Sequence, residues 1–101
     1  MKHYKLYING EFKNSRSNKS FESIDPSTEE AWATIAEANK DDVNDAVEAA
    51  YNAFNGEWSS ILPNQRAYFL RKIGDQLKEN AELLGKIETI DTGKLFRETK
   101  T

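Results

Sequence analysis

The sequence of 101 residues contains no cysteine. This absence excludes disulfide bridges, cysteine-ligated zinc, iron–sulfur clusters and a thiolate nucleophile within these residues. Histidine is nearly absent as well, because His3 is the single one and cannot supply the several imidazoles of a typical histidine-bound metal site. The chain therefore lacks the side chains from which the commonest metal centres and covalent catalysts are built.

Long apolar runs and a basic stripe are also missing. No stretch approaches the roughly 20 apolar residues of a membrane-spanning helix, and the first five residues, MKHYK, lack the apolar block of a signal peptide. The 14 basic and 17 acidic side chains are interspersed and give a formal net charge of −3. We therefore expect a cytoplasmic protein whose partners include neither nucleic acid nor membrane.

Apolar content is low for a folded domain. Hydrophobic residues make up 38% and charged residues 31% of the chain, against the roughly 45–50% apolar content that is usual. A chain of this size buries only about 60–68% of its unfolded surface. We expect one small domain with a thin core, too small to enclose a cofactor pocket by itself.

Residues 1–38 are predicted to be β-structure. Apolar and polar side chains alternate over residues 4–12 around Asn9-Gly10, which is the strongest short signal for a type I′ hairpin because both turn positions need positive φ. Three more stretches follow: a polar loop at residues 14–20, a short strand at residues 21–24 that ends in Asp-Pro-Ser-Thr, and an alternating strand at residues 31–36. Together they predict a small antiparallel sheet.

Four aromatic residues in this region leave two interpretations. Tyr4, Tyr7, Phe12 and Phe21 are either core side chains or a platform on which nucleobases stack. A stacking platform is normally accompanied by a basic groove, which the sequence lacks, so packing in the core is favoured.

The hydrophobic period changes from two to 3.6 at Asn39. Asn39 is suited to cap a helix, and Asp41 and Asp42 place negative charge where the first exposed amides of a helix favour it. We predict a first helix over residues 40–54, within a segment 39–56 that ends in a left-handed cap at Asn55-Gly56.

A long second helix is predicted within residues 62–90, with Pro63 as its first residue. From Pro63 to Glu88 it would be about 39 Å long at about 1.5 Å per residue, which exceeds the diameter of so small a domain. Part of its apolar stripe, including Leu77, Leu84 and Ile87, therefore needs a partner. Gly93 is a plausible cap, and residues 91–101 are expected to be a linker.

Catalytic motifs are absent from the sequence. It has no G-x-S-x-G elbow, no G-x-G-x-x-G and no Walker A motif, so we assign no catalytic residue and no cofactor-binding residue. The acidic pairs Glu29-Glu30 and Asp41-Asp42 are better explained by a turn and by a helix start than by acid–base catalysis.

Eight segments occur in a specific order and spacing. They are YKLYINGEF (4–12), FESIDPST (21–28), IAEA (35–38), DVNDAVEAAYNAF (42–54), Trp58, PNQR (63–66), LRKI (70–73) and ETIDTGK (88–94). Together they closely resemble the N-terminal stretch of the aldehyde dehydrogenase superfamily. The resemblance implies that this α+β segment, a small antiparallel hairpin sheet followed by two helices, is the N-terminal part of an α/β Rossmann-like cofactor domain.

The resemblance also implies an activity for a longer parent protein. Members of this superfamily oxidise an aldehyde to a carboxylic acid with NAD or NADP, using a cysteine thioester and a glutamate-activated water. Those catalytic residues have no counterpart in this chain, so we expect the 101 residues alone to be inactive and to bind no NAD. The parent is expected to be a homo-oligomer that acts on an aldehyde substrate.

The resemblance implies one possible metal site. Ser23, Ile24 and Asp91 match family positions that contribute oxygen ligands to a monovalent cation, Na⁺ or K⁺, and such a hard cation prefers oxygen. The alternative is that Asp91 is simply a solvated residue at a helix end.

Two departures from the family pattern are local. Glu29 replaces the usual glycine after Pro-x-Thr, so we expect the turn to avoid positive φ. Leu62 replaces a capping Ser or Thr before Pro63, which weakens the start of that helix by roughly 1 kcal/mol.

The sequence also fits a second function. The chain could be a standalone interaction or scaffolding domain that has kept a dehydrogenase start and binds a partner through the apolar stripe of its second helix.

Overall fold

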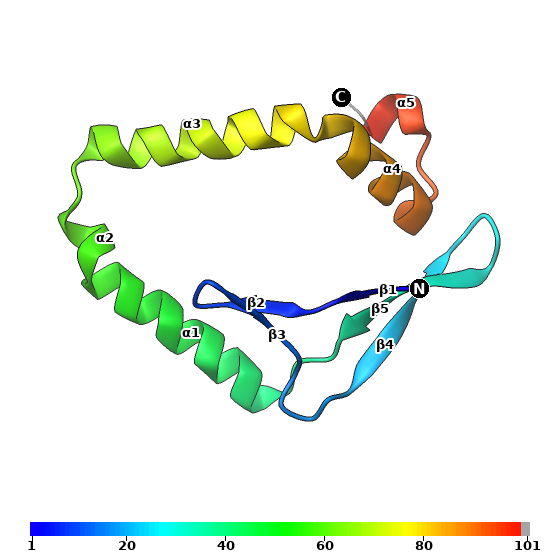
Figure 1. Ribbon diagram of the computed structural model, residues 1–101, viewed down its shortest axis with the longest axis horizontal. Helices are drawn as coiled ribbons and strands as arrows, with labels where there is room; N and C mark the ends of the chain where they lie inside the picture. The colour runs from blue at the N-terminus through cyan, green and yellow to red at the C-terminus, as the bar shows by residue number, and fades with distance from the viewer. Residues whose placement is uncertain (100–101) are drawn as a thin grey trace. The chain divides into compact units, whose positions relative to one another are not determined.

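The computed structural model describes residues 1–99, and these form two compact units (Figure 1). Unit 1 comprises residues 1–23 and 31–60, and unit 2 comprises residues 24–30 together with the chain from residue 61 onward. Short strands and helices occur together, so the predicted α+β class is confirmed. Within residues 1–99, no helix is both long and apolar enough to cross a membrane.

The strands form two small sheets. Their bounds are β1 (Lys2–Tyr4), β2 (Leu6–Ile8), β3 (Glu11–Lys13), β4 (Ser20–Asp25) and β5 (Glu30–Ala36). One sheet has the order β1-β5-β4 and the other is the β2–β3 hairpin. The antiparallel prediction is wrong for β1, which pairs parallel to β5 with His3 opposite Thr34. Such pairing needs a long crossover, which the hairpin, the polar loop and β4 supply.

The hairpin turn has the predicted geometry. Asn9 and Gly10 have φ angles of 53° and 78°, as a type I′ turn requires. The antiparallel register that follows places Tyr7 opposite Phe12. Local sequence therefore determines this turn and its register.

The aromatic residues of the β-region are not a core. Tyr7 and Phe12 are 63% and 73% exposed, and Phe21 is exposed as well, so the prediction that they pack inside the domain is wrong for these three. Tyr7 and Phe12 pack on each other, with ring centroids 4.7 Å apart. Tyr4 alone is half-buried, and its ring lies edge-on to that of Trp32.

The first helix, α1 (Lys40–Asn55), begins where the sequence predicted, with Asn39 as its N-cap. The left-handed cap predicted at its end is wrong, because Gly56 has a φ of −102°. The chain passes directly into the short helix α2 (Glu57–Ser60), and the backbone N–H of Ser59 donates to the Gly56 carbonyl at 3.1 Å. A second turn of helix thus replaces the expected reversal.

Unit 2 has two helices where one long helix was expected, α3 (Pro63–Glu79) and α4 (Ala81–Thr92). The division falls at Asn80, whose φ and ψ are −105° and 14°. Both its backbone N–H and its side-chain Nδ2 donate to the Gln76 carbonyl, at 3.1 and 2.9 Å. An asparagine side chain that satisfies a terminal carbonyl competes with helix continuation, which explains the break.

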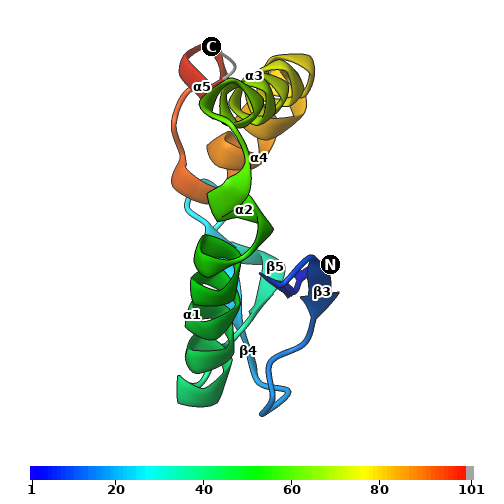
Figure 2. The same cartoon turned by 90° about the vertical axis from the view of Figure 1, so that its left-hand side faces the viewer.

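The end of α4 is capped by Gly93 in the predicted left-handed conformation, with a φ of 79°. Residues 91–101 are more than a linker, because a further short helix, α5 (Phe96–Thr99), follows and lies beside α4 (Figures 1 and 2). The Thr99 hydroxyl donates to the Gly85 carbonyl at 2.8 Å. The last two residues of the expected linker, 100 and 101, lie outside the described residues.

The core is as thin as the composition predicted. Among residues 1–99 the buried hydrophobic side chains are those of Ala33 and Ala36. The apolar stripe of the C-terminal helices is largely uncovered: Leu77 is 56% and Leu84 is 44% exposed. The sequence prediction that this stripe lacks a partner within the chain is confirmed for these two leucines.

Candidate functional site

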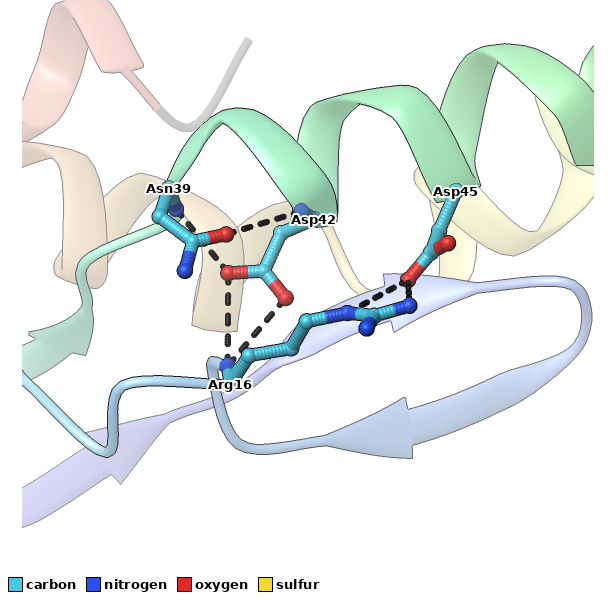
Figure 3. Close-up of polar contacts among 4 residues, drawn as sticks. All are labelled: Arg16, Asn39, Asp42 and Asp45. Atoms are coloured by element: carbon cyan, nitrogen blue, oxygen red, sulfur yellow. Dashed lines mark hydrogen bonds and ion pairs between the residues drawn. The ribbon is translucent and has the colours of Figure 1, made fainter.

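A network of polar contacts surrounds the N-terminus of α1 (Figure 3). We call it the α1 junction, and its members are Arg16, Asn39, Asp42 and Asp45. The backbone N–H of Asp42 donates to the Asn39 side chain at 2.9 Å, and the Asp42 carboxylate accepts from the Asn39 backbone N–H at 2.9 Å. These reciprocal bonds make a capping box, which satisfies donors that a helix start leaves unpaired.

Asp42 also holds the polar loop at residues 14–20. Its two carboxylate oxygens lie 3.2 and 3.3 Å from the backbone nitrogen of Arg16. The residue is only 2% exposed, and a buried carboxylate is tolerated only when it is hydrogen-bonded. Asp42 therefore links two segments that are far apart in sequence, and it does so from a buried position.

The side chain of Arg16 adds an outer contact. Its Nε and one terminal nitrogen donate to the same Asp45 oxygen at 3.0 and 2.6 Å. The hydrogen bond and the charge of Asp45 raise the pKa of Arg16 above its ordinary value. The guanidinium is solvent-exposed, so this ion pair orients the loop and contributes little to stability.

The junction was only half visible in the sequence. Asn39 and Asp42 have the spacing of a capping box and lie at a change of hydrophobic period, so this part was predictable. Arg16 was not predictable, because its partners are 26 and 29 residues away and its own segment reads as an ordinary surface loop.

The residues predicted to bind a cation divide between the two units. Ile24 and Asp91 both belong to unit 2, whereas Ser23 is the last residue of the adjoining stretch of unit 1. Asp91 is exposed in the last turn of α4. Oxygen donors of this kind fit a hard monovalent cation. Among residues 1–99 no group of three or more acidic or imidazole side chains is placed to hold a metal ion, so the site stays a prediction.

The turn that precedes β5 lies against the end of α4. A Cβ added to Gly93 would be 3.1 Å from the ring Cγ of Pro26. Asp25 starts this turn, and its carboxylate accepts from the backbone N–H and the hydroxyl of Ser27 at 2.9 and 2.8 Å. These hydrogen bonds lower the pKa of Asp25 below its usual value. The Asp25 carboxylate is therefore engaged in shaping the turn.

Glu29 corrects one sequence prediction. We expected the turn to avoid positive φ because glutamate stands where the family has glycine, yet Glu29 has a φ of 62°. Its backbone N–H donates to the Asp25 carbonyl at 2.8 Å. The turn keeps its geometry and imposes on glutamate a conformation that costs roughly 1–2 kcal/mol.

An open apolar groove of about 520 Å³ lies along α3 and α4. Eight residues line it: Phe69, Lys72, Ile73, Gln76, Leu77, Asn80, Leu83 and Leu84. Asn80 itself lines the groove, at the break where α4 turns away from the direction of α3 (Figure 1). A surface of this kind is typical of a face that another polypeptide covers.

The chain was compared with known proteins by sequence. A family model described as "Aldehyde dehydrogenase family" matches residues 12–101. Aldehyde dehydrogenase 1 of Tanacetum cinerariifolium is 48% identical over 98 residues, which cover 96% of this chain and 20% of that protein. A butyrolactone dehydrogenase of Acinetobacter baylyi, acting on a 5-hydroxybutyrolactone derivative, is 43% identical over 102 residues.

Solved structures give the same result. An aldehyde dehydrogenase from Bacillus cereus matches with a TM-score of 0.93 and 36% identity, over 96% of this chain and 20% of that one. Betaine aldehyde dehydrogenase from Staphylococcus aureus, solved with NAD⁺, matches with a TM-score of 0.91 and 37% identity over 95% of this chain. The chain therefore spans about a fifth of the length of the relatives it matches.

Proposed function

Because the chain belongs to the aldehyde dehydrogenase family, we propose that the protein containing it oxidises an aldehyde to a carboxylic acid, with NAD or NADP as oxidant. Support for NAD comes from the structural relatives of Bacillus cereus and Staphylococcus aureus, which were solved as NAD⁺ complexes. The 101 residues contain no cysteine and no glycine-rich phosphate loop, so we assign no catalytic step to them.

The role of this chain is structural within that enzyme. It forms the N-terminal part of the cofactor-binding domain, and α3 and α4 pack against the remaining polypeptide. The observation that carries this proposal is the apolar groove, whose leucines are about half exposed. Burying apolar surface stabilises by about 25 cal/mol per Å², so covering this face would contribute strongly to the stability of the whole enzyme.

Three further properties belong to the same proposal. The enzyme is a cytoplasmic homo-oligomer, and it binds Na⁺ or K⁺ with help from Asp91 and from backbone oxygens at Ser23 and Ile24. A carboxylate with carbonyl oxygens is suitable chemistry for such an ion, which takes several oxygen ligands.

A chimera tests the proposal directly. The segment of the Bacillus cereus aldehyde dehydrogenase that aligns with this chain is replaced by residues 1–101, and aldehyde-dependent reduction of NAD⁺ is followed by absorbance. We expect a folded enzyme with kcat/KM within about tenfold of the parent. A matched control carries Leu77→Asp and Leu84→Asp, which place charges in the groove and should abolish folding and activity.

Two results would contradict the structural role. One is a chimera that fails to fold or has no activity, since a segment with the proposed function should support the rest of the enzyme. The other is a double aspartate control that is as active as the unmodified chimera, because the groove would then be uncovered in the enzyme. A standalone interaction domain, the other function considered from the sequence, predicts the first of these results.

A further inference from the structure

A second hollow, unrelated to the apolar groove, lies in unit 1. It measures about 260 Å³ and is lined by seven residues: His3, Asn14, Ser15, Asn18, Lys19, Ser20 and Ala36. Six of the seven are polar, and two of these can carry positive charge. None is acidic. We call it the polar hollow.

The loop that forms most of the polar hollow is held rigidly. The buried Ser15 donates its hydroxyl to the Lys19 carbonyl at 3.1 Å, and the Asn18 backbone N–H donates to the Ser15 carbonyl at 3.0 Å. The Lys19 carbonyl also accepts from the backbone N–H of Glu37 at 2.9 Å. The loop has no apolar side chains to bury, so it would stay at the surface without these hydrogen bonds.

The α1 junction fixes the same loop from its other side. Asp42 holds the backbone N–H of Arg16, and Asp45 holds the Arg16 side chain (Figure 3). With both sides held, the backbone of the loop keeps its position before any ligand arrives. Preorganisation of this kind removes part of the ordering cost that binding would otherwise carry.

The groups that line the hollow are donors for an anion. His3 uses Nδ1 for a contact of 2.7 Å with the Thr34 hydroxyl, which leaves Nε2 for a ligand. Within residues 1–99, the side-chain amides of Asn14 and Asn18 have no hydrogen-bond partner, and Lys19 has no ion pair. A hydrogen bond in which the donor or the acceptor is ionised is roughly twice as strong as one between neutral groups.

We propose that the polar hollow binds a small oxyanion, the phosphate or carboxylate group of a ligand, through Lys19, His3 and the amides of Asn14 and Asn18. Lys19 supplies the charge, and the neutral donors determine where the oxygens lie. The test uses the chimera, so its aldehyde-dependent activity is measured first; an active chimera that binds no anion separates failure of this proposal from failure of the proposed function.

Titration calorimetry on the chimera tests the proposal, with sodium phosphate, sodium acetate and glycerol as probes at constant ionic strength. We expect saturable binding of phosphate or acetate and none of glycerol; the stronger of the two anions identifies the group. Lys19→Gln should weaken binding about tenfold or more. Asn18→Gly should weaken it also, and it suits the φ of 58° at that position.

Lys13→Gln is the matched control, because it removes the same charge from β3 outside the hollow. It should change affinity by less than about twofold, since Lys13 does not line the hollow and salt screens exposed charges. If a variant of the hollow does not fold, the unmodified chimera still decides, because anion should slow amide exchange in residues 14–20. Absence of both effects overturns the proposal. Equal losses of anion affinity in the Lys13 and Lys19 variants would mean an adventitious ion only. Glycerol that binds as well as the anions would overturn the proposal, because recognition would then not depend on charge.

Discussion

The α1 junction and the groove of α3 and α4 differ in how far this chain alone supplies their contacts. At the junction, buried Asp42 finds its donors within unit 1, on Asn39 and Arg16. Along the groove, leucines that need burial stay about half exposed in unit 2. The polar groups of the α1 junction are satisfied by the chain itself, and the apolar surface of the groove is not covered by it.

The difference follows from the range of the two interactions. A hydrogen bond needs a single partner at a defined distance, which a neighbouring turn or loop can provide. Hydrophobic burial scales with area, and about a hundred residues do not supply enough surface to cover every apolar face. A segment that spans a fifth of its relatives' length therefore completes its local polar structure and leaves its packing incomplete.

The largest effect is expected at the groove. We predict that the isolated chain self-associates, and that Leu77→Glu with Leu84→Glu weakens this association by about 3–4 kcal/mol, more than 100-fold, because both copies lose apolar contact and would bury charge. Sedimentation velocity over a range of concentrations measures the change. Asn64→Glu, on exposed α3 surface outside the groove, is the charge control and should have little effect.

A different result would remove the contrast between the two regions. If the unmodified chain sediments as a monomer and unfolds cooperatively, its apolar face needs no cover and the comparison with the α1 junction fails. Association that survives the double glutamate substitution would place the contact elsewhere, with the exposed Tyr7 and Phe12 pair as the next surface to test.

A smaller effect is expected at the junction. Asp42→Ala should leave two backbone donors without their acceptor and destabilise the helix start by about 2 kcal/mol. Hydrogen exchange in the chimera should then show roughly 30-fold lower protection at Arg16 and in the first turn of α1. Asp41→Ala removes the same group from an exposed position and should change protection much less. Similar losses of protection in both variants would show that the start of α1 is stabilised by negative charge and not by the hydrogen bonds of the α1 junction.

The sequence predicted those features that depend on nearby residues. The turn at Asn9-Gly10, the cap at Asn39 and the left-handed Gly93 were all correct, because each rests on backbone preferences within a few residues. The uncovered apolar stripe was also predictable, since a helical stripe longer than the available partners has to remain exposed. Neither inference needs knowledge of distant contacts.

Features that depend on distant pairing could not be predicted. The parallel contact of β1 with β5 joins His3 to Thr34, and alternation of side chains does not specify which strand is the neighbour. The ion pair of Arg16 with Asp45 could not be predicted for the same reason, because its partners are far apart in the sequence. The break at Asn80 is a different failure: the apolar period continues through it, so periodicity alone favoured one helix, although an asparagine at that position was a signal for an end.

The smallest effect concerns Gly93, at a place in unit 2 where local sequence determines the structure. Gly93→Ala should destabilise the end of α4 by about 1 kcal/mol, because its φ of 79° disfavours a side chain and the new Cβ would meet Pro26 at 3.1 Å. Gly74→Ala is the matched change inside α3, where a Cβ meets nothing within 4 Å, so it should stabilise by about 0.5–1 kcal/mol. Hydrogen exchange of each helix in the chimera measures both, and opposite signs are expected. If Gly93→Ala is neutral, the left-handed conformation of Gly93 depends on packing by the rest of the enzyme. Local sequence would then determine the structure at the α1 junction but not at the end of α4.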